Sequence, residues 1–261
     1  MNQYSLTEMT TFFEKHYFQQ LEKIKNNKNI LNYNNHKIRH TYGVLFTAQR
    51  IMTYEKEVFN SPEIIKKAEI ASLLHDIGRF YQNDWQRVLS WKEFEHGDVW
   101  YEILKKEWIT DLAILFWVKY HNKKDINWIY NEEAFKNSTN QEEIINVLNL
   151  VRDADKLQNL EYILFNFNDR IFWLDKTDNK YTEIVVEQIL NKEIVDRQYK
   201  KTYIDNILAF TWWIFDLNFQ TSKKFLVNDK FVDFIIWKLV EVNLEKDLIS
   251  KIKTTLEEYL K

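Results

Sequence analysis

The chain has 261 residues, of which 45% are apolar, with a net charge of −3, three Gly, one Pro and no Cys. The apolar content is enough for a sizeable core in one large or two small domains. The composition excludes disulfides, thiolate catalysis and iron–sulfur ligation, and its mixed charges give no basic stripe for nucleic acid.

Helices are favoured over strands, because strand-rich folds need Gly and Pro at their many turns. The N-terminus has no basic start followed by an apolar stretch, and no apolar run reaches the roughly 20 residues that span a bilayer. We therefore expect an all-α, soluble, cytoplasmic protein with no signal peptide and no membrane span.

The hydrophobic periodicity divides the chain into helices and loops. An Asn-rich loop is predicted at 26–35, a polar, loop-rich stretch at 122–140 and a connection at 169–182. The helices are expected at about 6–24, 36–54, 62–77, within 90–108 from near 96, 110–120, 141–165, 183–190, 201–219, 229–242 and 245–259. We predict one domain over 1–261, with a site-bearing part at about 36–165 and a C-terminal helical extension at about 183–261.

An adjacent His-Asp pair, His75 and Asp76, ends the helix that Ser61 and Pro62 begin. Ser61 supplies an N-cap hydroxyl, Pro62 lacks an N–H where none is needed, and Gly78 ends the helix. The helical period puts His75 on the apolar face. A lone histidine on such a face is usually a hydrogen-bonded core residue, but a buried carboxylate beside it needs a partner such as a metal ion.

The long helix at 141–165 carries two aspartates in RDADKLQN. Asp155 falls on the apolar face that Ile144 and Val151 define, so it is the inward carboxylate; a salt bridge to a buried cation is the alternative. Asp153 points to the opposite side and is expected to be solvated or to support a ligand from behind. Asn159, one turn after Asp155, could face the same cavity; an ordinary polar helix residue is the alternative.

Further histidines precede and follow the pair. His40 shares an inward helix face, whereas His36 is expected to be structural or exposed, and His16 has no companions. His96 stands at a helix start and His121 at a helix end, where a protonated imidazole would suit the dipole. Neutral imidazoles with carboxylates are what a water-accessible divalent metal needs.

Two cations adjoin these groups. Arg79 follows the His-Asp pair and is placed to clamp phosphate oxygens, unless it pairs with a surface acid. Lys156 adjoins Asp155 and is a second candidate for binding substrate.

LLHDIGRF, with His40 before it and ADKLQN after it, resembles the HD superfamily of metal-dependent phosphohydrolases over about residues 36–165. The resemblance implies an HD-domain helical bundle and one or two divalent ions, of Mn, Mg, Fe, Co or Ni. It implies that the first ion is held by His40, His75, Asp76 and Asp155, and a second by His96, His121 and a bridging Asp76.

The C-terminal part more weakly resembles the tail of a group of uncharacterised bacterial HD proteins. That group commonly reads HDIGRFEQ, and this chain has Tyr81 in place of the Glu. The acidic pair of (p)ppGpp hydrolases and the GYP signature of cyclic-di-GMP hydrolases are absent.

These features predict a phosphohydrolase that attacks a nucleotide or other small phosphate ester with metal-activated water. Asp76 and Arg79 would be catalytic, and Arg79, Lys156 and Asn159 would bind substrate. Two alternatives stay open: a di-iron oxygenase on the same ligands, and a non-catalytic HD domain that binds a ligand or partner.

Overall fold

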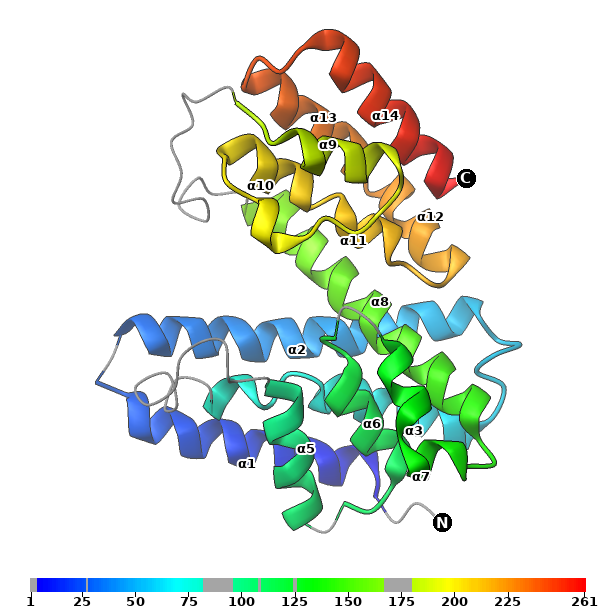
Figure 1. Ribbon diagram of the computed structural model, residues 1–261. Helices are drawn as coiled ribbons and strands as arrows, with labels where there is room; N and C mark the ends of the chain where they lie inside the picture. The colour runs from blue at the N-terminus through cyan, green and yellow to red at the C-terminus, as the bar shows by residue number, and fades with distance from the viewer. Residues whose placement is uncertain (1–3, 27, 82–95, 108, 124–125, 167–179) are drawn as a thin grey trace. The chain divides into compact units, whose positions relative to one another are not determined.

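A computed structural model describes residues 4–26, 28–81, 96–107, 109–123, 126–166 and 180–261 (Figure 1). All the regular elements in these ranges are helical, which confirms the all-α prediction. The chain forms two compact units, 1–155 and 156–261, and each is described by itself. The single-domain organisation stays a prediction.

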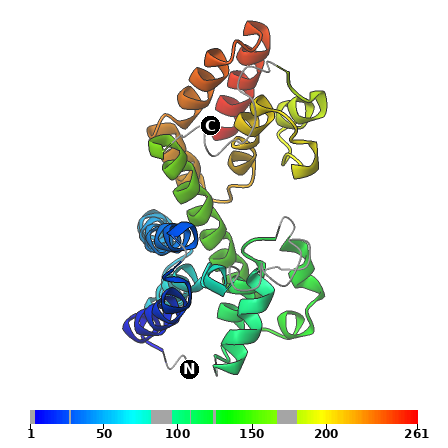
Figure 2. The ribbon, with the colours of Figure 1, turned by 90° about the vertical axis from the view of Figure 1, so that its left-hand side faces the viewer.

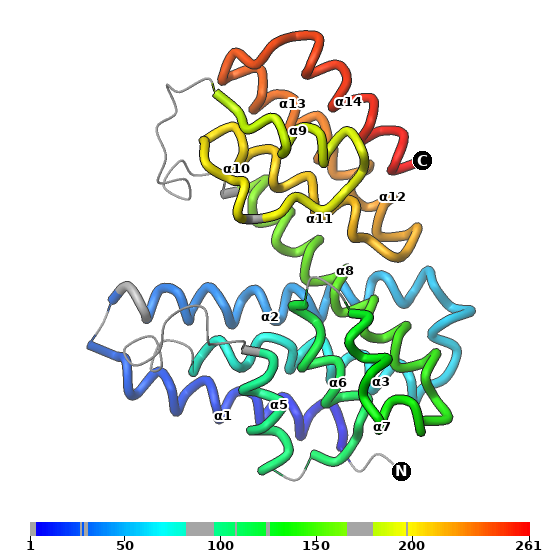
Figure 3. Tube along the Cα trace, viewed as in Figure 1, coloured from blue at the N-terminus to red at the C-terminus, as the bar shows by residue number. Residues whose placement is uncertain are grey.

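The first unit is built around α3, which contacts α1, α2 and α6. The tube in Figure 3 shows α1 and α2 running side by side as a hairpin. The elements of this unit are α1 (Leu6–Ile24), α2 (Lys28–Tyr54), α3 (Pro62–Leu74), α5 (His96–Lys106), α6 (Leu112–Tyr120), the 3-10 segment η1 (Ile126–Asn131), α7 (Glu133–Lys136) and α8 (Gln141–Asn166), whose last turns belong to the second unit.

The Asn-rich segment before His36 is helical, so the loop predicted at 26–35 is wrong: α2 begins at Lys28. Asparagine has a low helix propensity, but tertiary contacts override propensity where a segment is packed. Asn34 is completely buried, and the Tyr17 hydroxyl of α1 donates to Asn35 Oδ1 at 2.6 Å. These contacts hold the first turns of α2 against α1.

Side-chain caps set the starts of the helices that carry the site. The Ser61 hydroxyl accepts the Ile64 N–H at the start of α3, as the sequence predicts. Asp111 accepts the N–H groups of Ala113 and Ile114 at the start of α6. α3 ends at Leu74, three residues earlier than predicted, and the chain turns at once.

The second unit contains α9 (Glu183–Leu190), a 3-10 turn (Arg197–Tyr199), α10 (Tyr203–Ala209), α11 (Trp212–Phe215), α12 (Gln220–Asn228), α13 (Phe231–Glu241) and α14 (Lys246–Leu260). Figure 2 shows α13 and α14 packed side by side. The single helix predicted at 201–219 is wrong, because it breaks between α10 and α11. At that break the buried Thr211 hydroxyl donates to the Leu208 carbonyl and competes with the helical pattern.

Aromatic side chains at the break also pack into the second unit. Phe215 and Phe219 are buried, whereas Trp212 and Trp213 are partly exposed. Among the described helices, none is long and apolar enough to cross a membrane.

Candidate metal centre

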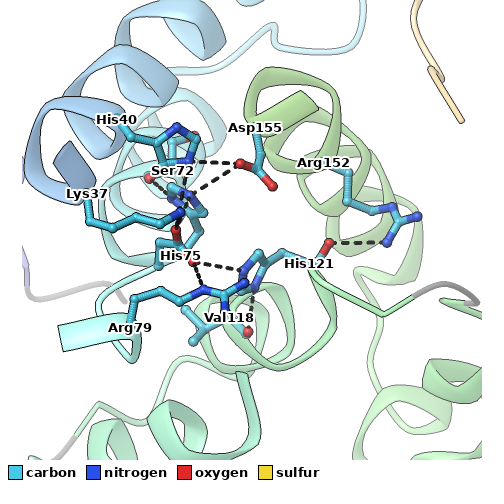
Figure 4. A network of polar contacts seen from close by, with 10 residues as sticks. Lys37, His40, Ser72, His75, Arg79, Val118, His121, Arg152 and Asp155 are labelled. Atoms are coloured by element: carbon cyan, nitrogen blue, oxygen red, sulfur yellow. Dashed lines mark hydrogen bonds and ion pairs between the residues drawn. The ribbon is translucent and has the colours of Figure 1, made fainter. Parts of the chain in front are cut away.

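Five side chains of the first unit lie close together. Four of them, His40, His75, His121 and Asp155, are labelled in Figure 4. His40 lies in the middle of α2 and Asp155 on α8. His75 and Asp76 follow the last residue of α3, and His121 follows the last residue of α6. All of them except Asp155 are buried. His75, Asp76 and His121 thus come from the ends of helices, whereas His40 and Asp155 lie within helices.

Three of these side chains form a compact group of metal-ligand atoms. His40 Nε2 lies 2.9 Å from Asp155 Oδ1, and His75 Nε2 lies 3.9 Å from the same oxygen. The ligand atoms of His40, His75 and Asp155 all lie within 4.8 Å of one another. Two imidazole nitrogens and one carboxylate at this spacing could hold a divalent metal ion.

Asp76 stands between this group and His121. Its Oδ2 lies 3.8 Å from His40 Nε2 and 3.9 Å from His75 Nε2. Its Oδ1 lies 3.9 Å from His121 Nε2. One carboxylate therefore presents one oxygen to His40 and His75 and the other oxygen to His121.

The rings of His75 and His121 are both oriented by a hydrogen bond to a backbone carbonyl. Each is the C-cap of its helix, and each places Nδ1 beside the carbonyl three residues earlier, Ser72 O at 2.7 Å and Val118 O at 2.8 Å. A carbonyl only accepts, so Nδ1 carries the proton and donates it. The Nε2 atoms then face the centre, which is the arrangement in which a backbone carbonyl orients a metal-ligating histidine.

The chemistry of these donors fits a metal ion. His40 Nε2 and His75 Nε2 are buried, and neither makes a hydrogen bond within the described part of the chain. The short approach of His40 to Asp155 does not have hydrogen-bond alignment. Burying polar atoms without a partner is costly, and a cation at their meeting point would satisfy both nitrogens and the carboxylate together.

The protonation states also suit metal binding. Burial lowers the pKa of His75 to about 4, although Asp76 and Asp155 oppose this shift, so the ring is neutral at pH 7. Burial raises the pKa of Asp155, but its contact with His40 and the nearby His75 outweigh burial and lower the pKa overall. A neutral imidazole and an ionised carboxylate are the forms that ligate metals.

Two cations hold Asp76 from either side. Lys37 Nζ lies 2.7 Å from Asp76 Oδ2, and Arg79 Nε donates to Asp76 Oδ1 at 3.2 Å (Figure 4). Arg79 therefore pairs with a buried acid of the centre. Lys37 was missed by the sequence analysis, and its position three residues before His40, on the same helix face, is the signal that would have found it.

Lys156 and Asn159, the other predicted substrate ligands, belong to the second unit. Lys156 is buried and its Nζ lies 3.1 Å from the Asp216 carbonyl oxygen and 3.0 Å from Asp216 Oδ2. The structure thus gives Lys156 a partner inside the second unit, which does not support a role in binding substrate. Asn159 is partly buried, and its role stays a prediction.

Asp153 is completely buried, so the expectation that it is solvated is wrong. The prediction that Asp153 and Asp155 point to different sides of the helix agrees with the structure, because Asp155 lies in the ligand group and Asp153 does not. The error lay in taking the opposite side of α8 as solvent. Residues 151–154 are all buried, so this part of α8 is covered around its whole circumference.

His96 is the first residue of α5, but its side chain lies outside the described part of the structure. Its neighbour Gly97 packs tightly on the end of α6. A Cβ at Gly97 would lie 2.7 Å from Lys119 O and 2.8 Å from Val118 O, the carbonyl that orients the His121 ring. The absence of a side chain at Gly97 therefore lets the backbone of His96 approach the turn that carries His121.

Arg152 supports the same turn from α8. It is buried, and its Nη1 donates to the backbone oxygens of His121 at 3.2 Å and Lys123 at 2.5 Å. The sequence analysis gave Arg152 no role. Arg152 lies one turn before Asp155 on α8, and this spacing is the sequence signal that would have indicated a role for Arg152.

The comparisons with known proteins agree with this geometry. Residues 38–160 match the family model of the HD domain. No curated protein and no solved structure gives a match to the chain. The matched residues include every candidate ligand, namely His40, His75, Asp76, His96, His121 and Asp155. These residues, slightly less than half of the chain, match the HD-domain family.

Proposed function

We propose that the protein is a metal-dependent phosphohydrolase that acts on a nucleotide or another small phosphate ester. One observation carries the proposal. His40 Nε2 and His75 Nε2, both buried without a hydrogen bond in the described chain, converge with a carboxylate oxygen of Asp155. The HD domain is a family of metal-dependent hydrolases, and this group is what such an enzyme needs.

The first ion would be held by His40, His75, Asp76 and Asp155. Asp76 would bridge to a second ion held by His121 and His96. The division of the Asp76 oxygens between His75 and His121 supports this, as does the close packing of Gly97 on the turn before His121. Imidazole and carboxylate ligands do not choose among Mn, Mg, Fe, Co and Ni.

A divalent ion in such a site lowers the pKa of bound water, which becomes a nucleophile near neutral pH. The chain's own groups prepare the centre for an anion. Arg79 and Lys37 fix both oxygens of Asp76, and Arg79 is 28% exposed, so a ligand can reach its guanidinium. We assign Arg79 to the phosphate oxygens, where its planar charge would stabilise the charge that develops during the reaction.

The test is metal analysis of protein purified without chelator, followed by a phosphate-release screen over nucleotides and simple phosphate esters. We expect a divalent metal to co-purify and phosphate release to depend on it. Metal-loaded protein that contains iron, consumes oxygen and releases no phosphate would replace the proposal with an oxygenase. Protein that takes up metal but turns over neither class of substrate would leave a binding domain.

A further inference from the structure

We infer that the second unit has a binding site of its own, for a small amphiphilic anion with an apolar body and one negatively charged head group. The site is a cavity lined by residues of α12, α13 and the end of α14, three helices that pack on one another within this unit (Figure 1). All of its lining residues lie between 224 and 261, so the site is separate from the metal centre and goes beyond the proposed function.

The cavity has the size and the apolar lining that a small organic molecule needs. Its volume is about 440 Å³, and the buried side chains of Leu226, Val232 and Leu260 line it. Val227 lines it as well and is 54% exposed. Pockets for small molecules have volumes of about 300–1,000 Å³ and a mostly apolar lining. An apolar ligand body in the cavity would remove the Val227 side chain from water, which is favourable.

Two lysines supply positive charge at the exposed edge of the cavity. Lys224 and Lys230 both line it, and both are exposed. Within the described part of the chain, neither ammonium group makes an ion pair, a hydrogen bond or a ring contact. Unpaired cations beside an apolar lining are complementary to the head group and the body of an amphiphilic anion.

The other charged groups of the cavity do not cancel this charge. Two acids line it, and they share one cation: Lys253 Nζ lies 3.9 Å from Asp233 Oδ1 and 3.6 Å from Glu257 Oε1. Lys261 also lines the cavity, but its ammonium group and the main-chain carboxylate of this last residue offset each other. Together with the two unpaired lysines, these groups leave one positive charge, which matches a ligand with a single negative charge.

The backbone at Lys230 is strained. Its φ of 54° lies in the left-handed region, where glycine is tolerated and a residue with a Cβ is disfavoured. Lys192 has a similar φ of 62°, but its Nζ lies 3.5 Å from Glu258 Oε2, so its side chain has a partner in the protein. The side chain of Lys230 lines the cavity without such a partner. A lysine that occupies a strained position in this way fits a role in binding a ligand.

The probe for the site is anilinonaphthalene sulfonate, whose aromatic rings carry one sulfonate and whose fluorescence rises when it leaves water. Val227→Glu places a negative charge on the cavity lining and should weaken probe binding at least about 10-fold, because like charges in contact are strongly unfavourable. Val240→Glu is the matched control. Val240 is 55% exposed and, like Val227, is the next-to-last residue of its helix, but it does not line the cavity. This variant should bind the probe as the wild type does.

Lys230→Gly tests the contact with the head group. Glycine adopts a positive φ without steric cost, so the variant should remain folded. It should bind the probe about 2- to 5-fold more weakly, which is the strength of an exposed ion pair. Lys192→Gly, at the other left-handed lysine, should leave probe binding unchanged. The wild type should bind phenylnaphthylamine, which has the same rings without the sulfonate, more weakly than the probe.

Circular dichroism checks that the four variants are folded, as expected from the exposure of all four positions. The inference is overturned if the wild type does not bind the probe, or binds the uncharged compound as tightly. It is also overturned if Val227→Glu binds the probe like Val240→Glu, or Lys230→Gly like Lys192→Gly. None of these results bears on the proposed function, which metal content and phosphate release decide separately, because the cavity lies in the other unit.

Discussion

Asp205 in the second unit and His75 in the first are both completely buried, but their polar atoms are satisfied in different ways. The Asp205 carboxylate accepts from Thr182 N and Oγ1, both at 2.7 Å, and from the backbone N–H groups of Lys201 and Thr202, both at 2.9 Å. His75 donates a hydrogen bond from Nδ1 to the Ser72 carbonyl, whereas its Nε2 makes no hydrogen bond within the described residues.

The difference distinguishes a structural polar group from one prepared for a ligand. The bonds of Asp205 join the start of α10 to the segment before α9, and they satisfy the carboxylate within the protein. At the metal centre, the buried Nε2 atoms of His40 and His75 converge with a carboxylate oxygen of Asp155 instead. Because unsatisfied buried polar atoms are costly, the second arrangement is stable only when something else supplies the missing interaction.

The largest effect is expected for Asp155→Asn, which tests whether the buried nitrogens of His40 and His75 converge on a metal site. The amide keeps the volume of the side chain but loses the charge that the metal needs. Metal affinity should fall by at least about 100-fold, because losing even an outer partner of a ligand costs 10- to 100-fold. Metal content and phosphate release of the purified variant check the result.

Asp153→Asn is the matched control two residues away on α8. Asp153 is buried but is not in the ligand group, so this variant should keep its metal even if it loses stability. If Asp153→Asn loses metal and Asp155→Asn keeps it, the assignment of Asp155 as the ligand is wrong.

The converse experiment is Asp205→Asn. This change should lower the free energy of unfolding by about 2–3 kcal/mol, because donors that now bind a charged carboxylate would face an amide. Metal content should not change, since Asp205 belongs to the other unit. Urea unfolding measures the first effect and metal analysis the second; a loss of metal together with unchanged stability would reverse our assignment of Asp205 as structural.

Gly97→Ala tests the second metal position. The new methyl group would meet backbone oxygens of Val118 and Lys119, which cannot move aside as a flexible side chain could. We expect a stability loss of about 1–2 kcal/mol from overpacking. We also expect bound metal to fall from about two ions per chain toward one, because the His121 turn shifts. Two ions bound as in the wild type would show that the packing of Gly97 does not position this turn.

Sequence patterns predicted the parts of the fold that depend on local chemistry. The cap at Ser61 and the apolar period of α8 are local, so the start of α3 and the inward position of Asp155 could be predicted. The helical start of α2 depends on a contact with Tyr17, which is distant in sequence, so the loop prediction was wrong. The break at Thr211 depends on a side-chain hydrogen bond to the Leu208 carbonyl, which the apolar period does not reveal, so the prediction of one helix was also wrong.

The sequence indicated which types of residue form the candidate site better than it indicated which residues contact one another there. A histidine or aspartate on an inward face stands out in a sequence, so His40, His75 and Asp155 were candidates, and the structure brings their ligand atoms together. Lys37 and Arg152 were missed because a Lys or Arg is normally read as a surface residue, and only the folded chain shows their buried partners. Burial of Asp153 was missed for a related reason, since one helix cannot show that its far side is covered.

The smallest effect concerns His16, a buried histidine that no metal group includes. It packs against Phe12, Tyr81 and Trp100, and its Nδ1 contacts the Tyr81 hydroxyl. Burial lowers the pKa of His16 below its ordinary value of 6.5, while Glu107 opposes the shift and Lys15 adds to it. The folded state therefore prefers the neutral ring.

Below pH 6.5 the unfolded chain takes up a proton at His16 that the folded chain does not, so stability should fall as the pH decreases through this value. Urea unfolding of chelator-treated protein at pH 7.5 and 5.5 measures the loss. His16→Gln removes this contribution while leaving the other histidines, so the loss between the two pH values should be smaller in the variant. Equal losses in the two proteins would mean that His16 titrates alike in the folded and unfolded chains, and its burial would then have no electrostatic consequence.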